Sequence, residues 1–362
     1  MTTEVSLQTN TSWPIYGHIA AIHRLQRAIT PALEYADTSV QGKGLRHAYL
    51  FLGPRHVGKT TVARTFAQAL LCRHSQERPC QICRSCRLMQ TNRHPDFRLI
   101  SPLDKEGNID RDNGMLRVDQ ATELVREAAL SPVESRYKLF LIQDMQTAND
   151  NFANKLLKTI EEPPEHVVLC ISASDRSGVL PTVVSRCQLV ELQLLGASTI
   201  AQALCVGWQG EPEQAHLLAK LAGGRLGWAV ERLTNETLWQ ERSELLQELW
   251  DLIDSNRLQR LAFAEKLASK RDEKRIFNML EVWTAWWRDV LLVQSGCADS
   301  CSNIDCMGQI EQHAAHISAG VVQQYMNALQ RIERYLQHTT NLRLALDVLL
   351  LKLPYLSMDK VI

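Results

Sequence analysis

The sequence has no excess of charge of either sign, because its 40 Lys and Arg residues match its 40 Asp and Glu residues. Such a chain is not a polycation, so any contact with nucleic acid must come from a local basic surface or from partners that complete a binding channel. It also has no low-complexity tract, and 22% of its residues are charged, as in an ordinary globular protein. At 362 residues it is long enough for two or three domains, each with a core of its own.

The sequence also lacks the signals of a membrane or secreted protein. No apolar run reaches the roughly 18 residues that predict a membrane span, and the longest candidate, Leu342 to Leu353, is interrupted by Arg343 and Asp347. The first residues, Met1 to Ser12, are polar and do not have the charged-then-apolar order of a signal peptide. The 10 cysteines therefore indicate metal ligands and buried thiols in a cytosolic setting, not a disulfide framework.

Strand and helix signals alternate in the first half of the chain. Runs such as LFLI at 139–142 are apolar at every position, which is typical of parallel strands covered on both faces. We therefore predict an α/β sandwich. The expected strands are His47–Leu52, Asp96–Ile100, Tyr137–Ile142, Val167–Ser172 and Gln188–Leu192. The expected helices between them include Lys59–Leu71, Val118–Ala129 and Asn149–Glu161.

The strand signals stop near Leu194, and helix follows helix from there. We expect an α/β domain at 1–193, a small helical domain at 194–240 and an all-α domain at 241–362. Apolar residues recur three to four apart, for example Leu280, Trp283, Trp287 and Leu291. Such stripes are expected to form intramolecular core, and a subunit interface is the alternative.

Residues 53–60, GPRHVGKT, fit the phosphate-loop pattern G-x-x-x-x-G-K-[ST] at every fixed position. The loop follows an expected strand and opens an expected helix, as a nucleotide site requires. Gly53 and Gly58 let backbone N–H groups turn toward phosphate oxygens, and the helix N-terminus adds a partial positive charge. Lys59 is expected to reach the β- and γ-phosphates of ATP, and the Thr60 hydroxyl is expected to ligate Mg²⁺. Thr61, the next residue, is also expected to belong to the nucleotide site. A loop that keeps this shape but binds nothing is the alternative.

The acidic partner of this loop is weakened. The expected strand at 137–142 ends in Gln143-Asp144, where an active motor of this type normally has two acids, one for Mg²⁺ and one to activate water. Asp144 is therefore only a weak catalytic candidate, and we expect little hydrolysis at this chain's own site. Ser172 and Ser174, at the end of the next strand, either sense a γ-phosphate or only cap the strand.

Four cysteines, Cys72, Cys80, Cys83 and Cys86, have the spacing C-x7-C-x2-C-x2-C. Four thiolates suit tetrahedral zinc, and a site ligated only by protein is structural because no position stays open for substrate. An iron–sulfur cluster is the alternative, but the ferredoxin pattern needs a fourth cysteine three residues further on and then a proline. We predict a zinc module at 72–86 that is coupled to the folding of its loop.

The other cysteines carry less information. Cys170 is expected to be a small buried residue in its strand. Cys297, Cys301 and Cys306 are expected to be exposed thiols in a variable connection, and a second metal site is the less favoured alternative.

The order of these features resembles bacterial DNA polymerase III clamp-loader subunits. The resemblance includes NKLLKTIEEPP at 154–164 and Ser185-Arg186-Cys187, and it runs from Tyr16-Gly17-His18 to NLRLAL at 341–346, nearly the whole chain. Two subunit types share these motifs, the ATP-hydrolysing gamma/tau motor and the delta-prime subunit.

Three departures from the motor favour the delta-prime type. The acidic pair is Gln143-Asp144, and Gly227 stands where the motor has its nucleotide-sensing arginine, with Arg225 out of register. The chain also ends soon after its last expected helix, without an extended tail like that of tau.

The resemblance implies an AAA+ core with a helical lid and a C-terminal collar in a hetero-pentameric ring with motor and delta-type subunits. That ring, a component of the DNA polymerase III holoenzyme, opens the sliding clamp and places it on primed DNA. Arg186 would then serve as an arginine finger in the neighbouring motor's ATP site; an ordinary surface arginine is the alternative.

Two other functions remain open at this point. A gamma/tau-like motor would hydrolyse ATP itself and would need Lys59 for turnover. A zinc-knuckle nucleic-acid-binding module with an inactive phosphate loop would bind DNA alone, with strong salt dependence. The neutral net charge and the lack of aromatic residues within 80–86 argue against that module.

Overall fold

The computed structural model describes residues 13–34, 44–74, 77–111, 114–270, 272–336 and 341–356. The chain divides into two compact units. The first comprises the chain up to Ala203 together with Gly224–Trp228, and the second comprises Leu204–Gly223 together with the chain from Ala229 onward.

The first unit is built on a parallel five-stranded sheet with the order β2-β3-β4-β1-β5. The register is continuous across its middle, where Tyr49 of β1 pairs with Cys170 of β4 on one side and with Gln188 of β5 on the other. The five predicted strands are confirmed to within one residue at each end. Their bounds are β1 Ala48–Leu52, β2 Phe97–Ile100, β3 Lys138–Ile142, β4 Val167–Ala173 and β5 Gln188–Glu191.

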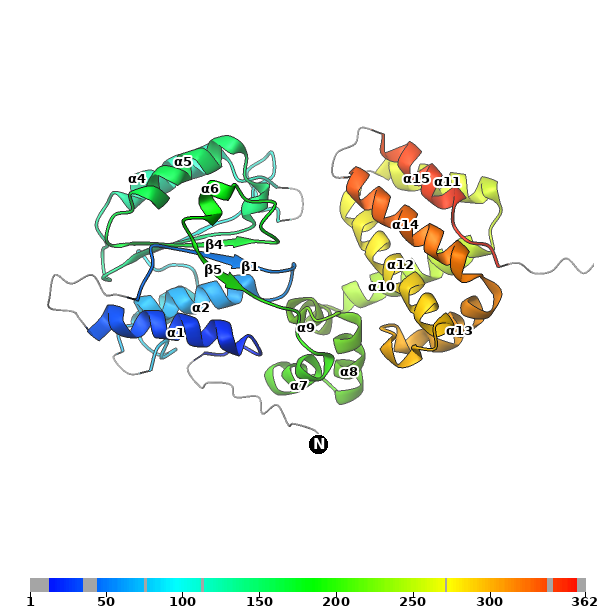
Figure 1. Cartoon of the computed structure of the whole chain (residues 1–362), viewed down its shortest axis with the longest axis horizontal. Coiled ribbons are helices and arrows are strands. Elements are labelled where there is room, and N and C mark those ends of the chain that lie inside the picture. The colour runs from blue at the N-terminus through cyan, green and yellow to red at the C-terminus, as the bar shows by residue number, and fades with distance from the viewer. Residues whose placement is uncertain are drawn as a thin grey trace, which may run out of the picture. The chain divides into compact units, whose positions relative to one another are not determined.

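Helices cover both faces of this sheet, as Figure 1 shows, with α1 and α2 on one face and α4, α5 and α6 on the other. Alternate residues of β1 enter the two cores: Tyr49 and Phe51 pack with the first, and Leu50 and Leu52 with the second. This burial on both sides explains why the strands are apolar at every position. The helix bounds are α1 Ile19–Glu34, α2 Lys59–Leu71, α3 Arg84–Gln90, α4 Val118–Ala128, α5 Asp150–Glu161 and α6 Pro181–Val184.

The strand order decides which loops meet. Because β4 lies between β1 and β3, the carboxyl ends of these three strands share one stretch of the sheet edge. The phosphate loop leaves the end of β1, Gln143 and Asp144 follow β3, and Ser172 lies near the end of β4. The sheet thus gathers the polar residues that the sequence pattern separates.

Beyond β5 the described chain contains only helices and short 3-10 turns, as predicted. None of the described helices is long and apolar enough to cross a membrane. The core of the second unit is centred on α12, whose Trp283, Trp286 and Trp287 are fully buried, so the predicted core stripe is confirmed. The helix bounds are α7 Ala197–Trp208, α8 Pro212–Leu221, α9 Leu226–Thr234, α10 Glu236–Ile253, α11 Arg257–Lys270, α12 Glu273–Gln294, α13 Met307–His316, α14 Ala319–Leu336 and α15 Leu342–Leu351.

The connection after α12 differs from expectation. Cys297 is exposed, as predicted, but the prediction of an exposed thiol at Cys301 is wrong, because this residue is fully buried. The segment folds back onto α12: the Cys301 thiol donates to the Asp289 carbonyl oxygen at 3.6 Å, and the buried Asp289 carboxylate accepts the backbone N–H of Ser302 at 2.9 Å. Cys306 is partly buried.

The buried guanidinium of Arg260 connects α10, α11 and α15 in the second unit. Arg260 of α11 is fully buried, and its side chain donates to the backbone carbonyls that end α10 and α15. These acceptors are the carbonyls of Leu252, Ile253, Leu350, Leu353 and Pro354. The last carbonyls of a helix have no partner within the helix, so Arg260 supplies donors that the backbone cannot.

We expect Arg260→Leu to lower the free energy of unfolding by about 3–5 kcal/mol, because several buried carbonyls would lose their donors at once. Denaturant unfolding followed by circular dichroism measures this loss. Arg257→Leu, in the first turn of the same helix, is the control: its side chain is exposed, and the expected change is within about 0.5 kcal/mol. If both variants lost the same free energy of unfolding, the buried hydrogen bonds of Arg260 would not be the source of the stabilisation.

Candidate nucleotide site and metal centre

The phosphate loop has the backbone conformation that its glycines were predicted to provide. Gly53 and Gly58 have φ of 149° and 107°, in the region that side chains rarely adopt. A Cβ at Gly53 would also lie 2.4 Å from the Leu192 carbonyl oxygen, so glycine is required there. Helix α2 begins directly after Gly58, at Lys59, so that its N-terminus opens onto the loop.

Lys59 is buried, and its Nζ donates to the carbonyl oxygens of Gly53 at 2.6 Å and Pro54 at 2.8 Å. Burial lowers the pKa of Lys59 to about 8, and the charges of Arg111 and Arg55 add to this effect while Asp144 opposes it. The ammonium is therefore mostly charged at pH 7 and able to meet a phosphate. Thr60 is partly buried in the first turn of α2, whereas Thr61 is exposed.

A neutral amide faces the residue that was expected to ligate Mg²⁺. The Gln143 side chain donates from Nε2 to Thr60 Oγ1 at 3.0 Å and accepts at Oε1 from the Ser101 hydroxyl at 2.7 Å. These two bonds tie the ends of β2 and β3 to the start of α2. The departure at Gln143 thus has a structural consequence, because an amide links the Thr60 hydroxyl to the sheet without bringing a negative charge.

The Asp144 carboxylate, which follows β3, is already paired. Arg111 donates from Nε and Nη2 to Asp144 Oδ2, both at 2.8 Å, and the Asp144 side chain is nearly inaccessible to solvent. The Ser172 hydroxyl accepts the Asp144 backbone N–H at 3.1 Å, so this serine supports the turn after β3. Arg111 was missed by the sequence analysis, since it lies in an irregular segment between β2 and α4, outside any motif.

Gly227 touches the phosphate loop through its backbone. Its N–H donates to the His56 carbonyl oxygen at 2.8 Å, and a Cβ built on Gly227 would lie 2.8 Å from that same oxygen. A side chain at 227 would therefore push the loop and the start of α9 apart. The close approach of the two backbones thus explains why this position holds a glycine.

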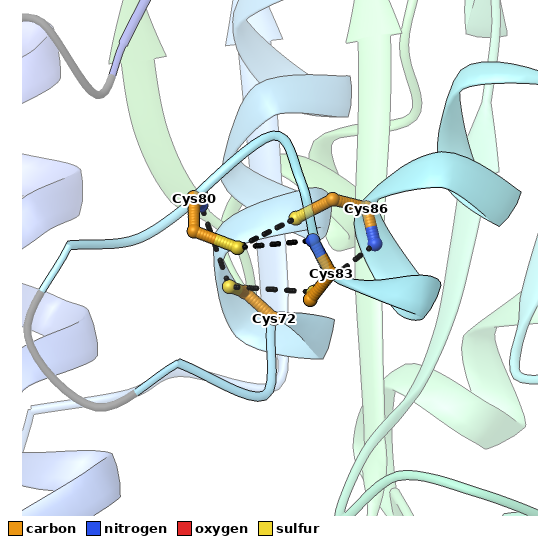
Figure 2. A group of neighbouring side chains, drawn as sticks. All are labelled: Cys72, Cys80, Cys83 and Cys86. Atoms are coloured by element: carbon orange, nitrogen blue, oxygen red, sulfur yellow. Dashed lines mark hydrogen bonds between the residues drawn. The ribbon is translucent and has the colours of Figure 1, made fainter.

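The four predicted ligands form one compact cluster at the far end of α2, shown in Figure 2. The Sγ atoms of Cys72, Cys80, Cys83 and Cys86 all lie within 4.8 Å of one another. Cys72 caps the C-terminus of α2, Cys83 caps the N-terminus of α3, and Cys86 is in α3. In the part of the chain that the structure describes, this is the one group of three or more such side chains placed to hold a metal ion.

The surroundings of the sulfur atoms affect the cysteine thiols differently. Backbone N–H groups of Cys80, Cys83 and Cys86 each donate at 3.4 Å, to the sulfur atoms of Cys72, Cys80 and Cys83 respectively. Burial alone would raise the pKa of Cys83, but backbone hydrogen bonds from Arg73 and Cys86 outweigh it and lower the pKa to about 6. Burial raises the pKa values of Cys72 and Cys86, and nearby cysteines add to the effect at Cys86. A divalent cation removes this penalty, so the donor set fits structural zinc.

The cysteine module is fastened to the sheet through Glu134. This carboxylate pairs with Arg73 and with Arg84, both at 2.9 Å, so it joins the two sides of the cysteine loop. The backbone N–H of Glu134 is in turn held at 2.8 Å by the buried carboxylate of Asp96, which precedes β2. The supporting contacts are long-range in the sequence, so cysteine spacing predicts the ligands but not their anchor.

Arg186 lies between α6 and β5, apart from the phosphate loop. Its guanidinium pairs with Glu161 at 3.0 Å and donates to the Thr182 carbonyl oxygen at 3.1 Å. Both partners of the ion pair are well exposed, at 41% and 44%, so the pair is weak and its arginine remains accessible. Glu161 belongs to the same EEPP segment that carries the family resemblance.

Comparisons with known proteins match both regions of the chain. Residues 30–196 match the family model described as DNA polymerase III, delta subunit, and residues 236–354 match the model of its C terminal. The DNA polymerase III subunit delta' of Bacillus subtilis is 26% identical over 87% of this chain and 93% of that protein. The subunit delta' of Pseudomonas aeruginosa is 32% identical over 57% of this chain and 61% of that protein.

Related subunits match as well. The subunit tau of Escherichia coli is 32% identical over 54% of this chain and 29% of that protein. The solved structure of a gamma subunit-related protein from Thermotoga maritima is 16% identical, with a TM-score of 0.44, and covers 84% of this chain and 94% of that chain.

The parallel sheet, the phosphate loop after β1 and the helical C-terminal region define a P-loop α/β protein with a cysteine insert. The two family models together match most of its length. The chain belongs to the DNA polymerase III delta-prime family.

Proposed function

We propose that the chain acts as the delta-prime-like subunit of the DNA polymerase III clamp loader, which helps to place the sliding clamp on primed DNA. The observation that carries this is an intact phosphate loop whose acidic partners are altered: an amide, Gln143, faces Thr60, and Asp144 is paired with Arg111. Neither Gln143 nor the buried Asp144 offers an accessible carboxylate to activate water, so this chain contributes little hydrolysis of its own.

Its contribution to hydrolysis is the Arg186 guanidinium, offered to the ATP site of a neighbouring motor subunit. The exposed ion pair with Glu161 supports this role, because an exposed pair contributes only about 0–1 kcal/mol and yields readily to a phosphate. Arginine suits the task because it is always charged and presents several N–H donors in a plane.

In the assembly the chain joins motor and delta-type subunits in a hetero-pentamer, and it meets the clamp and the primer-template DNA through that assembly at the bacterial, cytoplasmic replisome. Residues 1–193 would serve as the AAA+ domain, 194–240 as a lid and 241–362 as the collar. Helix α15 supports the collar role, because it leaves the large apolar side chains of Leu344, Val348 and Leu351 exposed.

The second candidate function is a hydrolysing motor of the gamma/tau type, which the intact loop with Lys59 favours. The two functions differ in which site performs the chemistry. A motor needs Lys59 of this chain for turnover, whereas a delta-prime-like subunit serves the site of its neighbour.

Reconstitution with motor and delta-type subunits, clamp and primed DNA separates the two. We expect DNA- and clamp-stimulated ATP hydrolysis and clamp loading to require this chain, and Lys59→Ala to change the turnover by less than about twofold, since the neighbour's site performs the chemistry. Loss of turnover with Lys59→Ala would favour the motor. If the chain did not join the assembly at all, the proposed function would be wrong.

A further inference from the structure

Two arginines and one carboxylate of the described residues act on the lysine of the phosphate loop. The arginines are Arg55 and Arg111, and the carboxylate is Asp144. Arg55, in the loop itself, donates from Nη2 to the Arg111 carbonyl oxygen at 2.8 Å, and Arg111 is bound in turn to Asp144. These two contacts hold the segment around Arg111 against the loop, although more than 50 residues separate Arg55 and Arg111 in the sequence.

The same residues are a poor donor set for Mg²⁺. This ion is usually held by one or two carboxylates together with the phosphates and water. Here the group that meets Thr60 is an amide N–H, a donor with no lone pair for a metal, and the neighbouring carboxylate oxygen already accepts two N–H groups from Arg111. One of the two carboxylates that would support the ion is thus replaced by Gln143, and one oxygen of the other, Asp144, is occupied by Arg111.

Arg111 is placed to take over the charge of that ion. Two of its N–H groups fix it to the buried Asp144, while its side chain as a whole remains 44% exposed at the loop. A guanidinium has five N–H donors, so one already held in position can give the others to phosphate oxygens with little further loss of conformational freedom. Lys59 and Arg111 would then supply two positive charges without a metal.

We propose that the phosphate loop of this chain binds the polyphosphate of a nucleoside triphosphate without a divalent cation, and that Arg111 is the residue that replaces the cation. The inference concerns the chain's own loop and does not depend on its role in a clamp loader. It also accounts for an intact loop beside an altered acidic pair, since the two arginines make the metal-binding acids unnecessary.

Titration of the full-length chain with a fluorescent ATP analogue tests this. One series contains Mg²⁺ and the other uses Mg²⁺-free buffer without chelator, because a chelator would compete for the zinc of the cysteine cluster. We expect the two dissociation constants to agree within about twofold, since the metal adds little to an already cationic site. Lys59→Ala, which removes the loop lysine, is expected to abolish binding and so to locate it.

Arg111→Ala is expected to weaken binding in Mg²⁺-free buffer by about 10- to 100-fold, the usual effect of losing charge-assisted hydrogen bonds. Arg98→Ala is the matched control: Arg98 has a similar exposure of 50% and pairs with Glu127 instead. The double variant Arg111→Ala with Gln143→Asp restores an acid pair, and its binding is expected to require Mg²⁺.

Three results would overturn the proposal: binding by the unaltered chain that needs Mg²⁺, unchanged affinity in Arg111→Ala, or no binding of the analogue in either buffer. The comparison of the two buffers needs no variant, so it remains decisive even if Arg111→Ala does not fold.

Discussion

Replacement of Arg186 by alanine is expected to lower ATP hydrolysis at the neighbouring motor's site by roughly 10³–10⁵-fold in the reconstituted clamp loader, the range observed for arginine fingers. The physical reason is the negative charge that develops on the transferred phosphoryl group, which a guanidinium held in place neutralises. Single-turnover hydrolysis measured with primed DNA and clamp would show the loss directly, because it separates chemistry from product release.

The matched control for this variant is Arg176→Ala. Arg176 is also exposed, at 58%, and pairs with Glu191, the last residue of β5, at the end of that strand opposite Arg186, so it tests for a general effect of removing surface charge. Gel filtration shows whether both variants still enter the assembly. If a loader assembled with Arg186→Ala kept full turnover, Arg186 would be an ordinary surface residue, and its proposed role in hydrolysis would be wrong.

Loss of one cysteine ligand is expected to remove the metal. The unaltered chain should carry one zinc ion, and Cys86→Ser should carry none, because Cys86 is fully buried among the other three sulfur atoms and a hydroxyl is a poor zinc ligand. The free energy that zinc contributes to folding is large, about 10–16 kcal/mol in isolated zinc-finger peptides, so the loop around the cluster should unfold locally. Elemental analysis and hydrogen exchange of residues 72–90 measure the two effects.

Cys297→Ser provides the control, since Cys297 is exposed and lies outside the cluster. This variant should keep the metal, and the midpoint of its thermal unfolding should equal that of the unaltered chain. Iron with visible absorption, in place of zinc, would favour the iron–sulfur alternative, and a Cys86→Ser variant that retained a full zinc ion would mean that the cluster is not the binding site. Acidification should release the metal, because zinc binding requires thiolates and protons compete for them.

The predicted strands and the helix after the phosphate loop were recovered from the sequence because their signals are local. Runs such as 139–142 must be apolar throughout when a parallel strand is covered on both faces, and the glycines of 53–60 mark backbone angles that other residues avoid. Cys72, Cys80, Cys83 and Cys86 were recovered for a similar reason, since a tetrahedral ion constrains the spacing of its ligands.

Arg111, Arg260 and Cys301 were beyond sequence reasoning because their roles depend on partners far away in the chain. Arg111 meets Asp144 through the strand order, and Arg260 reaches the ends of α10 and α15 only after those helices have packed. Cys301 lies in a polar segment that reads as an exposed loop until it folds back onto α12.

The sequence by itself determined the order of the elements, the phosphate loop, the cysteine ligands and the family motifs, all of which follow from short-range backbone and ligand geometry. The tertiary structure alone decided what surrounds them: an amide beside Thr60, an arginine on the Asp144 carboxylate that acts on Lys59, and a glycine backbone against His56. These contacts follow from packing, because the electrostatics of a site depend on which side chains share its space and not on their distance along the chain.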